Sequence, residues 1–366
     1  MLNKNFNNTF YGKKILITGH TGFKGSWLSL WLNELGATVI GYSLDPKNKN
    51  DNFNITNLQN NIIDIRGDIR DFNKLNKVFT EYKPEIIFHL AAQPLVKYSY
   101  EYPRETYEAN VIGTMNVLEA IRLHESAKIG IMVTSDKCYE NKEWPWGYRE
   151  NDPMGGHDIY SSSKGCCELL ISSYRNSYFS EEKFLQHKKI IASVRAGNVI
   201  GGGDWSKDRI IPDCIRALES NKKIIIRNPN ALRPWQHVLE PLNGYLLLTE
   251  KIINNGILFS GAWNFGPSQS NIVSVEKLVT SIIDIWGCGD WAPENLGQVN
   301  FHEANLLNLD ISKAKFSLNW QPKWSLQQTL KHTVEWYENY HSYSSTEMIN
   351  LCVNQIKQYS ALKKAH

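Results

Sequence analysis

The chain has 366 residues, 42% hydrophobic and 21% charged, which is typical of a globular protein with one large or two smaller domains. Its 40 basic and 37 acidic residues leave a charge of +3, too small and scattered an excess to indicate nucleic-acid binding. No run of about eighteen apolar residues indicates a membrane span, and residues 1–10 lack the apolar core of a signal peptide. The six cysteines show no CxxC spacing, so we expect reduced thiols, a cytoplasmic protein and no metal site.

The first two-thirds of the chain alternates short β-branched runs with longer amphipathic stretches. This alternation predicts parallel strands joined by right-handed helical crossovers, hence an α/β fold with a Rossmann-type doubly wound parallel sheet. The predicted strands are Lys14–Thr18, Thr38–Tyr42, Ile62–Arg66, Ile86–Leu90, Ile129–Thr134 and Ile190–Arg195. The predicted helices are Ser26–Leu35, Phe72–Tyr82, Thr106–His124 and Ser161–Tyr178.

The pattern loosens after about Gly197, where short segments such as Lys223–Arg227 alternate with helices such as Pro212–Ser220 and Pro241–Ile253. We therefore expect a Rossmann domain over residues 1–196 and a smaller, mixed α/β region over residues 197–366, with some exchange of chain between the two. The Asn-rich stretch near Asn48–Asn61 is predicted to be a solvated surface loop.

A glycine-rich turn directly follows the first predicted strand and precedes a helix. A glycine is needed where the chain reverses, where backbone approaches a pyrophosphate, and where helix meets strand. The helix N-terminus then offers free N–H groups and a positive dipole to the anion. A P-loop is excluded because Lys24 precedes Gly25 instead of following the last glycine. The residues expected to bind the dinucleotide here are Gly19, Thr21, Gly22, Phe23, Lys24 and Gly25.

An acid after the second strand holds the adenosine ribose of NAD in many such folds. Asp45 is the nearest candidate, although Ser43 lies closer to the strand end and Asp45 could also be a turn residue before Pro46. We accordingly favour NAD over NADP. Further expected cofactor contacts are Asp68 and Ile69 beside the adenine, and Leu90, Ala91 and Ala92 beneath the dinucleotide.

Tyr160 and Lys164 are spaced i and i+4, which places them on the same side of a helix. A tyrosine hydroxyl titrates near about 10, and a nearby ammonium and a nicotinamide cation should lower its pKa. The phenol could then accept a proton from an alcohol while hydride leaves the adjacent carbon. Ser135, after the fifth strand, would donate to the same hydroxyl or to a sugar oxygen. The alternative is a surface tyrosine and a solvated lysine.

These residues and several longer motifs carry a resemblance to the extended short-chain dehydrogenase/reductases, and among them to the CDP-glucose 4,6-dehydratases. The resemblance runs over nearly the whole chain. One departure is Ile159, where a proline often precedes the tyrosine in this superfamily, and it concerns loop geometry only. The motifs are Gly19–Trp27, His89–Gln93, Thr134–Asn141, Trp146–Glu150 and Arg233–Val238.

The resemblance implies NAD as cofactor and CDP-glucose as substrate, converted to CDP-4-keto-6-deoxyglucose and water for deoxysugar and O-antigen biosynthesis. Oxidation at C4 makes the C5 proton acidic, water is then eliminated across C5 and C6, and hydride returns to C6. Asp136 and Lys137 would supply the acid and the base. Related dehydratases have Asp-Glu at these two positions. The two roles could be exchanged, and Lys137 could instead be only a charge partner that holds Asp136.

Further site residues follow from the resemblance. Arg233 and Asn198 would hold the sugar diphosphate, and Asn110 would organise the active-site loop. Gln93, Ser135 and His237 would complete the substrate contacts, with Gln93 also touching the cofactor. His302 and Glu303 could reach the sugar or base. In this superfamily the helices expected at Thr106–His124 and Ser161–Tyr178 commonly form a four-helix contact, which implies a homodimer or homotetramer.

Three other functions stay open. Another sugar-nucleotide dehydratase would use the same groups on a different nucleotide. A sugar-nucleotide 4-epimerase would keep the turn, Tyr160 and Lys164, but it needs no acid/base pair after Ser135. A non-catalytic dinucleotide sensor would typically lack the tyrosine or the lysine.

Overall fold

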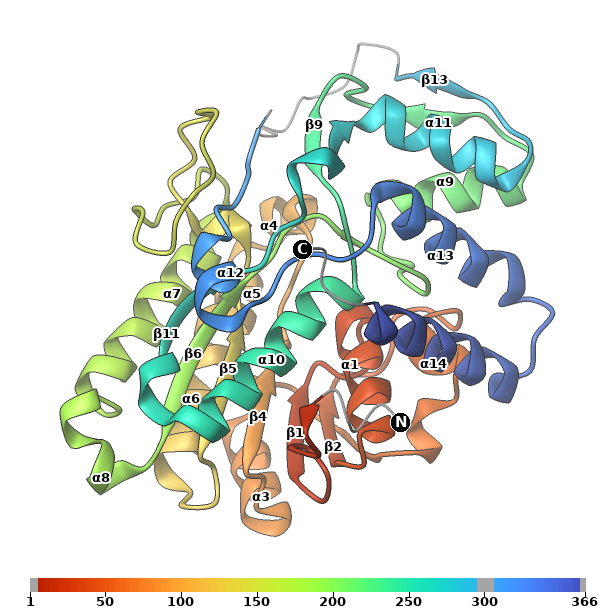
Figure 1. Cartoon of the computed structure of the whole chain (residues 1–366). Helices are drawn as coiled ribbons and strands as arrows, with labels where there is room; N and C mark the ends of the chain where they lie inside the picture. The colour runs from red at the N-terminus through yellow and green to blue at the C-terminus, as the bar shows by residue number, and fades with distance from the viewer. Residues whose placement is uncertain (1–5, 295–305, 363–366) are drawn as a thin grey trace.

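The structure is a computed structural model that describes residues 6–294 and 306–362. Its main feature is a seven-stranded sheet in the order β3-β2-β1-β4-β5-β6-β11, in which every neighbouring pair is parallel (Figure 1). The doubly wound Rossmann-type fold is thereby confirmed, and each of the six predicted strands is present. The strands are β1 (Lys14–Thr18), β2 (Thr38–Ser43), β3 (Ile63–Arg66), β4 (Ile86–His89), β5 (Ile129–Val133), β6 (Ile190–Arg195) and β11 (Gly261–Asn264).

Strand β11 was not predicted, because Gly261–Asn264 is short and contains no β-branched residue. It pairs with β6, so the part of the chain after residue 196 contributes a strand to the main sheet. The division of the chain at residues 196 and 197 stays a prediction.

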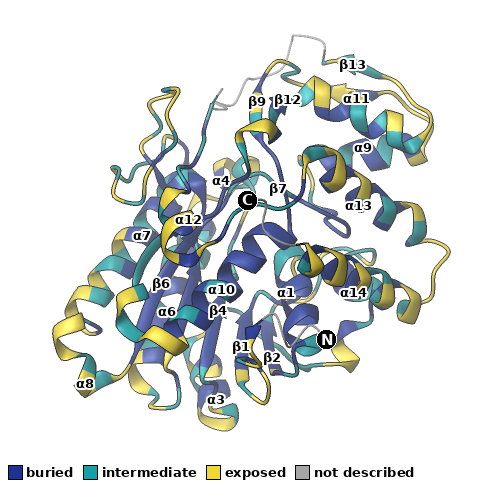
Figure 2. Ribbon diagram, viewed as in Figure 1, coloured by how far each residue is buried: buried dark blue, intermediate teal, exposed yellow. Residues whose placement is uncertain are grey.

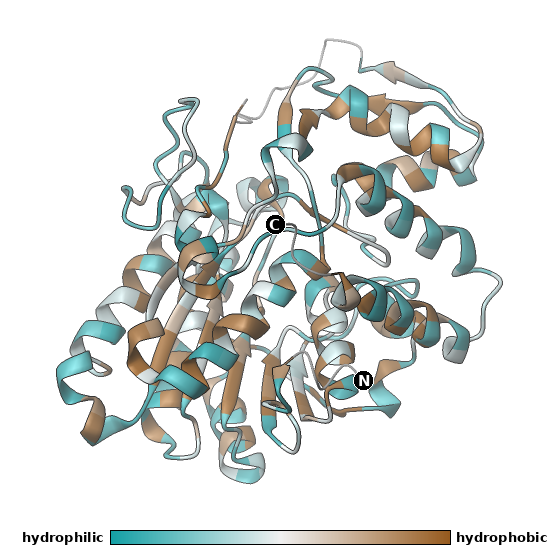
Figure 3. Ribbon diagram, in the orientation of Figure 1, coloured by the Kyte–Doolittle hydropathy of each residue, from teal (hydrophilic) through white to brown (hydrophobic). Residues whose placement is uncertain are grey.

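The sheet packs on both faces, and successive strand residues face opposite layers. Ile15 and Ile17 belong to one buried cluster with Trp27 and Trp31 of α1, whereas Leu16 belongs to another. Figure 2 shows these strands as buried, and Figure 3 shows them as hydrophobic along their length. Helices α1 (Phe23–Glu34) and α10 (Leu239–Asn255) supply residues to the first cluster. The second receives residues of α3 (Phe72–Tyr82), α6 (Gly113–Leu123) and α7 (Ile159–Ser177).

The helix predicted at Thr106–His124 is interrupted by a π turn. It begins as α5 (Pro103–Tyr107), passes through the π turn Glu108–Ile112, and continues as α6. A preceding short helix, α4 (Val96–Glu101), was not predicted. Hydrophobic spacing does not reveal a single wider turn, and π turns are frequent at functional sites.

The smaller part of the molecule is mixed α/β, as predicted, and much of it lies at the upper right of Figure 1. It contains three two-stranded sheets, in which β7 pairs with β10, β9 with β12, and β8 with β13. These strands are β7 (Val199–Ile200), β8 (Ile224–Ile226), β9 (Leu232–Pro234), β10 (Gln236–His237), β12 (Ile272–Ser274) and β13 (Trp291–Pro293). The remaining helices are α2 (Asn52–Ile55), α8 (Phe184–His187), α9 (Ile210–Glu219), α11 (Val275–Trp286), α12 (Ser312–Leu318), α13 (Leu326–Asn339) and α14 (Ser345–Ala361).

The prediction of a solvated loop at Asn48–Asn61 is wrong. Helix α2 lies within it, and Asn52, Phe53 and Leu58 are buried. The Asn52 amide donates to Ser26 Oγ at 3.0 Å and accepts from Trp336 Nε1 at 3.1 Å. A polar amide can thus be buried because both of its ends are hydrogen-bonded, which composition alone does not show.

The structure also bears on the cysteines, on metal sites and on membrane-spanning helices. All six cysteines lie in the described part of the chain and are free thiols. Over residues 6–294 and 306–362 no group of His, Cys, Asp and Glu side chains is arranged to hold a metal ion. Within the same ranges, none of the helices has the length and apolarity required to cross a bilayer.

Candidate active site

The glycine-rich turn joins β1 to α1 at the point where the order of the strands reverses, the place where open α/β sheets bind ligands. Gly19 has a φ of +77°, and a Cβ there would lie 2.7 Å from the Ala91 nitrogen. A Cβ on Gly25 would overlap the Gly19 carbonyl. Gly22 is the N-cap of α1 and provides no side-chain hydrogen bond, and the first turn has no acidic residue. The helix therefore presents free N–H groups, and the turn fits a dinucleotide pyrophosphate.

His20 fixes the turn to the sheet, a role that sequence reasoning missed. Its side chain is fully buried, and Nε2 lies 2.8 Å from Asp64 Oδ1 on β3. Its ring fills the space over Gly41 of β2, where any Cβ would overlap it. The sequence signal for this contact was Gly41, a glycine among bulky residues of strand β2. The next residue, Thr21, lies 2.9 Å through Oγ1 from Ser43 Oγ, at the end of β2.

Asp45, the predicted ribose ligand, lies beyond β2 with 87% of its side chain exposed. Its Oδ1 is 3.4 Å from Arg66 Nε. Ser43 is thus the nearer of the two candidates to the glycine turn, since it contacts Thr21 directly.

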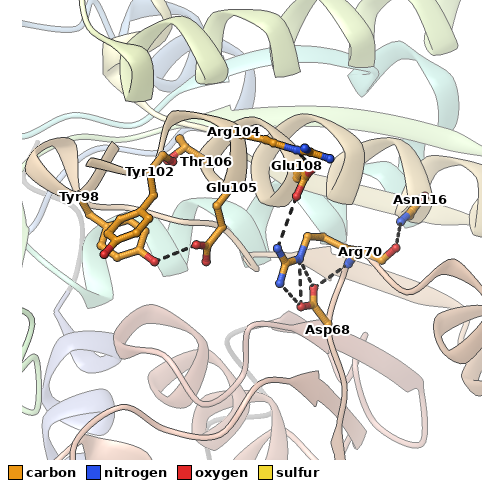
Figure 4. A network of polar contacts seen from close by, with 9 residues as sticks. All are labelled: Asp68, Arg70, Tyr98, Tyr102, Arg104, Glu105, Thr106, Glu108 and Asn116. Atoms are coloured by element: carbon orange, nitrogen blue, oxygen red, sulfur yellow. Dashed lines mark hydrogen bonds and ion pairs between the residues drawn. The ribbon is translucent and has the colours of Figure 1, made fainter. Parts of the chain in front are cut away.

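The turn after β3 carries Asp68 and Ile69, the residues predicted beside the adenine. Arg70 Nη2 lies 2.6 Å from Asp68 Oδ2, and its hydrogen bonds hold the pKa of Asp68 below its ordinary value (Figure 4). Arg70 also approaches Glu108 of the π turn at 3.6 Å, and Asn116 donates to the carbonyl of Ile69 at 2.9 Å. The turn after β3 is therefore tied to the π turn and to helix α6.

Helix α7 positions the tyrosine and the lysine. Asp158 caps it by accepting from the Ser161 nitrogen at 2.9 Å, so Tyr160 falls in the first turn and Lys164 one turn later. Both side chains are buried. The ammonium of Lys164 and that of Lys137 each lie 6.0 Å from the centre of the Tyr160 ring. The structure therefore brings the predicted oxidation pair and the predicted base to one place, which excludes the solvated-surface alternative for Tyr160 and Lys164.

The loop after β5 holds the other predicted catalytic groups. Ser135 caps the short 3₁₀ turn Asp136–Cys138, and its Oγ donates to Asp136 Oδ1 at 2.9 Å. The Asp136 carboxylate is buried directly against Gly197, where a Cβ would occupy the space of the carboxylate. Only glycine at 197 leaves room for the acid in this position.

Burial shapes the proton affinities of the site. It raises the pKa of Tyr160 to about 12, with the charge of Asp136 adding to the effect and the Ser135 hydrogen bond and Arg209 opposing it. Burial also lowers the pKa of Lys164. The protein's own groups therefore do not lower the pKa of Tyr160, contrary to the expectation, because desolvation outweighs the neighbouring positive charges.

Two more cations reach the site. Arg209 precedes α9 and pairs with buried Asp204 at 2.8 Å, and its charge acts on Tyr160 and Lys24. Burial, Arg209 and Lys164 lower the pKa of Lys24 to about 8, against the opposing charge of Asp136. Lys24 was predicted to contact the cofactor. Arg209 was missed, and the only sequence signal was a basic residue at the start of a helix after a glycine-rich segment.

The predicted substrate residues lie in different environments. Asn198 has a left-handed backbone, with φ +49°, and its carbonyl accepts from the Gln236 nitrogen at 3.2 Å. Arg233 is half-buried on β9 and donates to the Leu232 carbonyl at 3.0 Å. His237 is fully buried, with its ring centre 4.7 Å from that of Trp324. That placement gives His237 a packing role and no exposed surface toward a substrate.

The side chain of Gln93 is hydrogen-bonded to other groups of the protein. Its side-chain amide bonds the Leu95 nitrogen at 2.6 Å, the Leu95 carbonyl at 3.0 Å and Thr106 Oγ1 at 3.0 Å. Its backbone nitrogen donates to Asn110 Oδ1 at 2.8 Å, and Asn110 Nδ2 donates to Ser163 Oγ, beside Lys164, at 2.8 Å. Asn110 thus makes the expected backbone contact to the active-site loop. His302 and Glu303 lie outside the described residues.

Comparisons with known proteins agree with this geometry. The sequence model of the GDP-mannose 4,6 dehydratase family matches residues 16–333. A CDP-glucose 4,6-dehydratase of Salmonella typhimurium is 52% identical over 92% of this chain and 93% of its own length. An epimerase of Methanothermobacter thermautotrophicus superposes with a TM-score of 0.78 at 22% identity, covering 96% of this chain and 97% of that one.

A dTDP-glucose 4,6-dehydratase of Bacillus anthracis, solved in complex with NAD, superposes with a TM-score of 0.73 at 22% identity, covering 92% of this chain and 99% of that one. The structural likenesses establish the fold, and the sequence matches establish kinship. The chain belongs to the GDP-mannose 4,6 dehydratase family of sugar-nucleotide-modifying enzymes, within the extended short-chain dehydrogenase/reductases.

Proposed function

We propose that this protein is a CDP-glucose 4,6-dehydratase, which converts CDP-glucose to CDP-4-keto-6-deoxyglucose and water. The observation that carries the proposal is the convergence of a second proton-handling pair, Asp136 and Lys137, on the Tyr160–Lys164 pair. An oxidation alone needs only the latter pair. The 52% identity to the Salmonella enzyme supports the same substrate.

The site fits NAD. Gly19 and Gly25 leave no room for a Cβ, and α1 begins with uncapped N–H groups. When bound, NAD supplies the acceptor of hydride from C4 and the donor of hydride to C6. Lys24, in this turn, provides positive charge for the pyrophosphate.

The oxidation step depends on Tyr160. With a pKa raised to about 12, its hydroxyl is a neutral donor and acceptor that needs assistance to take the C4 hydroxyl proton. Ser135 has a single hydroxyl proton, and turning it from Asp136 to the phenol oxygen favours the phenolate. The positive charges of Arg209 and of the cofactor ring act in the same direction. Lys164, buried one turn away, stabilises the negative charge that develops on the phenol oxygen.

The elimination step is assigned to Asp136 and Lys137. Lys137 removes the C5 proton, which the C4 ketone has made acidic, and Asp136 protonates the departing C6 hydroxyl. The C5–H and C6–O bonds break and a C5=C6 double bond forms. The proton from C5 passes to the neutral amine of Lys137, and the proton of Asp136 leaves with the C6 hydroxyl as water. Asp136 is held for this task by Ser135 and by contact with Gly197.

The nucleotide part of the substrate is assigned to the smaller region. Arg233 and Asn198 are proposed to hold the diphosphate, and Arg209 adds a third group whose guanidinium is oriented by Asp204. Because His237 and Gln93 are engaged within the protein, we assign them to the support of this site.

The assembly is proposed to be a homodimer or homotetramer of a cytoplasmic protein. Helices α6 and α7 lie side by side and expose apolar side chains, with Leu123 53% and Leu169 62% exposed, and Tyr178, directly after α7, is 51% exposed. Such a shared apolar face suits contact with the same face of a second copy.

The test is incubation of the purified protein with NAD and CDP-, dTDP-, GDP- or UDP-glucose. A CDP-glucose dehydratase yields a 4-keto-6-deoxy sugar, with its base-induced ultraviolet chromophore, from CDP-glucose in preference to the others. Preference for another nucleotide would contradict the substrate. An isomer of equal mass indicates an epimerase, and no conversion of any sugar indicates a sensor.

A further inference from the structure

Arg195, at the end of β6, is hydrogen-bonded both to helix α7 and to the loop after β5, the two elements that carry the proposed catalytic residues. Its Nη2 donates to Glu168 Oε2 at 2.7 Å, and both side chains are only 4% exposed. Glu168 lies on α7 one turn beyond Lys164. It also accepts from Thr134 Oγ1 at 2.5 Å and from Ser193 Oγ at 2.8 Å. These hydrogen bonds of Glu168, here called the Glu168 arm, fix helix α7 to the end of β5 and to β6.

The other arm of Arg195 reaches the loop that carries the proposed acid and base. Its Nη1 donates to the Tyr139 hydroxyl at 2.5 Å, and its guanidinium lies 4.9 Å from the centre of the Tyr139 ring. Tyr139 directly follows the turn Asp136–Cys138, and its hydroxyl donates to Asn264 Oδ1 on β11 at 2.8 Å.

A buried ion pair adds little net stability, because the desolvation of both charges offsets their attraction. What a guanidinium offers instead is geometry: its planar fork sets the spacing of two partners in different directions. Here one partner lies on the helix of Tyr160 and Lys164, and the other lies next to Asp136 and Lys137. The arginine therefore fixes the position of one pair against the other.

We propose that Arg195, Glu168 and Tyr139 form a positioning triad that holds the elimination pair in register with the oxidation pair, so that both steps act on one bound sugar. The inference rests on the proposed function and deepens it. None of the three residues contacts the reacting atoms. The Tyr139 arm governs elimination, whereas the Glu168 arm governs oxidation.

The sharpest test is Tyr139→Phe, which keeps the ring over Arg195 and removes both hydrogen bonds of the hydroxyl. We expect C5 deuterium exchange from solvent and water loss to slow by about 10- to 100-fold, the scale for misplaced catalytic groups. C4 oxidation should proceed at its former rate, so the absorbance of reduced nicotinamide should build up on the enzyme. The matched control is Tyr245→Phe, because the Tyr245 hydroxyl is buried without a hydrogen-bond partner in the described structure.

A change in the Glu168 arm should slow oxidation instead of elimination. Glu168→Gln should slow C4 oxidation, measured by a single-turnover rise in nicotinamide absorbance, without any build-up of reduced cofactor during turnover. Arg195→Lys keeps the charge but loses the fork, so both steps should slow. This variant, with thermal unfolding recorded for each protein, decides the matter if Tyr139→Phe fails to fold.

The triad is overturned if Tyr139→Phe slows oxidation and elimination equally or leaves both unchanged, or if Tyr245→Phe produces the same build-up. It is overturned as well if folded Arg195→Lys retains both rates. Failure of the proposed function looks different, because the wild-type protein would then not form the 4-keto-6-deoxy sugar from CDP-glucose.

Discussion

At the scale of single residues, Lys137 distinguishes this site from one that only oxidises. Its Nζ lies as close to the centre of the Tyr160 ring as that of Lys164. For Lys137→Met we predict that C5 deuterium exchange from solvent disappears while the first hydride transfer survives, because only the base is removed. The measurement is product mass in heavy water together with single-turnover absorbance. Full turnover by the variant would contradict the assignment.

Lys24 gives the site a pH dependence of its own. Its pKa is lowered to about 8, so the side chain is mostly charged at about pH 7 and loses its positive charge as the pH rises through about 8. We predict that the affinity for NAD, which carries an anionic pyrophosphate, falls between about pH 7 and pH 9. Calorimetric titration with NAD across this range measures the effect.

Two variants of Lys24 test the predicted pH dependence of NAD affinity. Lys24→Met should bind NAD more weakly and without this pH dependence. Lys24→Arg should keep its affinity across the range, because a guanidinium stays charged. A wild-type affinity that is flat from pH 7 to pH 9 would rule out a role for the Lys24 charge in binding.

The i, i+4 spacing predicts the pairing of Tyr160 with Lys164, whereas the roles of Asp136 and Lys137 are implied by the family resemblance alone. The sequence did not predict Arg209 or the structural role of His20, because each acts through partners that are brought together only by the fold.

At the scale of elements, the loop after β5 and the end of β6 meet at Gly197, where Asp136 is packed against the backbone. We predict that Gly197→Ala reduces turnover by about 100-fold, because the added methyl displaces the acid. Steady-state assays with CDP-glucose measure this. Gly266→Ala is the control, since its Cβ would meet Leu309 at 3.3 Å and no catalytic group. Near-wild-type turnover by Gly197→Ala would mean that the position of Asp136 is not critical.

Elements with strong local patterns were the ones predicted well. Buried strands such as β6 and amphipathic helices such as α7 appear close to their expected bounds. Helix α2 and strand β11 were not predicted, because Asn52 is stabilised by distant Trp336 and β11 by its pairing with β6. Such long-range partners leave no periodic signal in the sequence.

At the scale of the whole molecule, Glu240 ties α10 to the C-terminal helix α14. Its buried carboxylate accepts from the Tyr359 hydroxyl at 2.6 Å and from the Trp324 nitrogen at 2.7 Å. Burial raises its pKa to about 7, so the folded state binds this proton more tightly than the unfolded state does. The resulting stability is complete below about pH 4.5 and is lost as the pH rises to about 7.

We therefore predict that the free energy of unfolding of the wild type falls relative to that of Glu240→Gln between about pH 5 and pH 7, by at most about 3 kcal/mol. Denaturant titrations of both proteins at several pH values measure the difference. A difference that does not change with pH would show that Glu240 is not protonated in the folded protein.

In the proposed reaction, the molecule couples oxidation at C4 to loss of water from the same sugar. The most direct measurement is turnover of CDP-glucose deuterated at C4, with NAD, in ordinary water. We expect a 4-keto-6-deoxy product that carries the deuterium on C6, because the hydride removed from C4 returns there. Deuterium back on C4 of a sugar that has kept its water would contradict it.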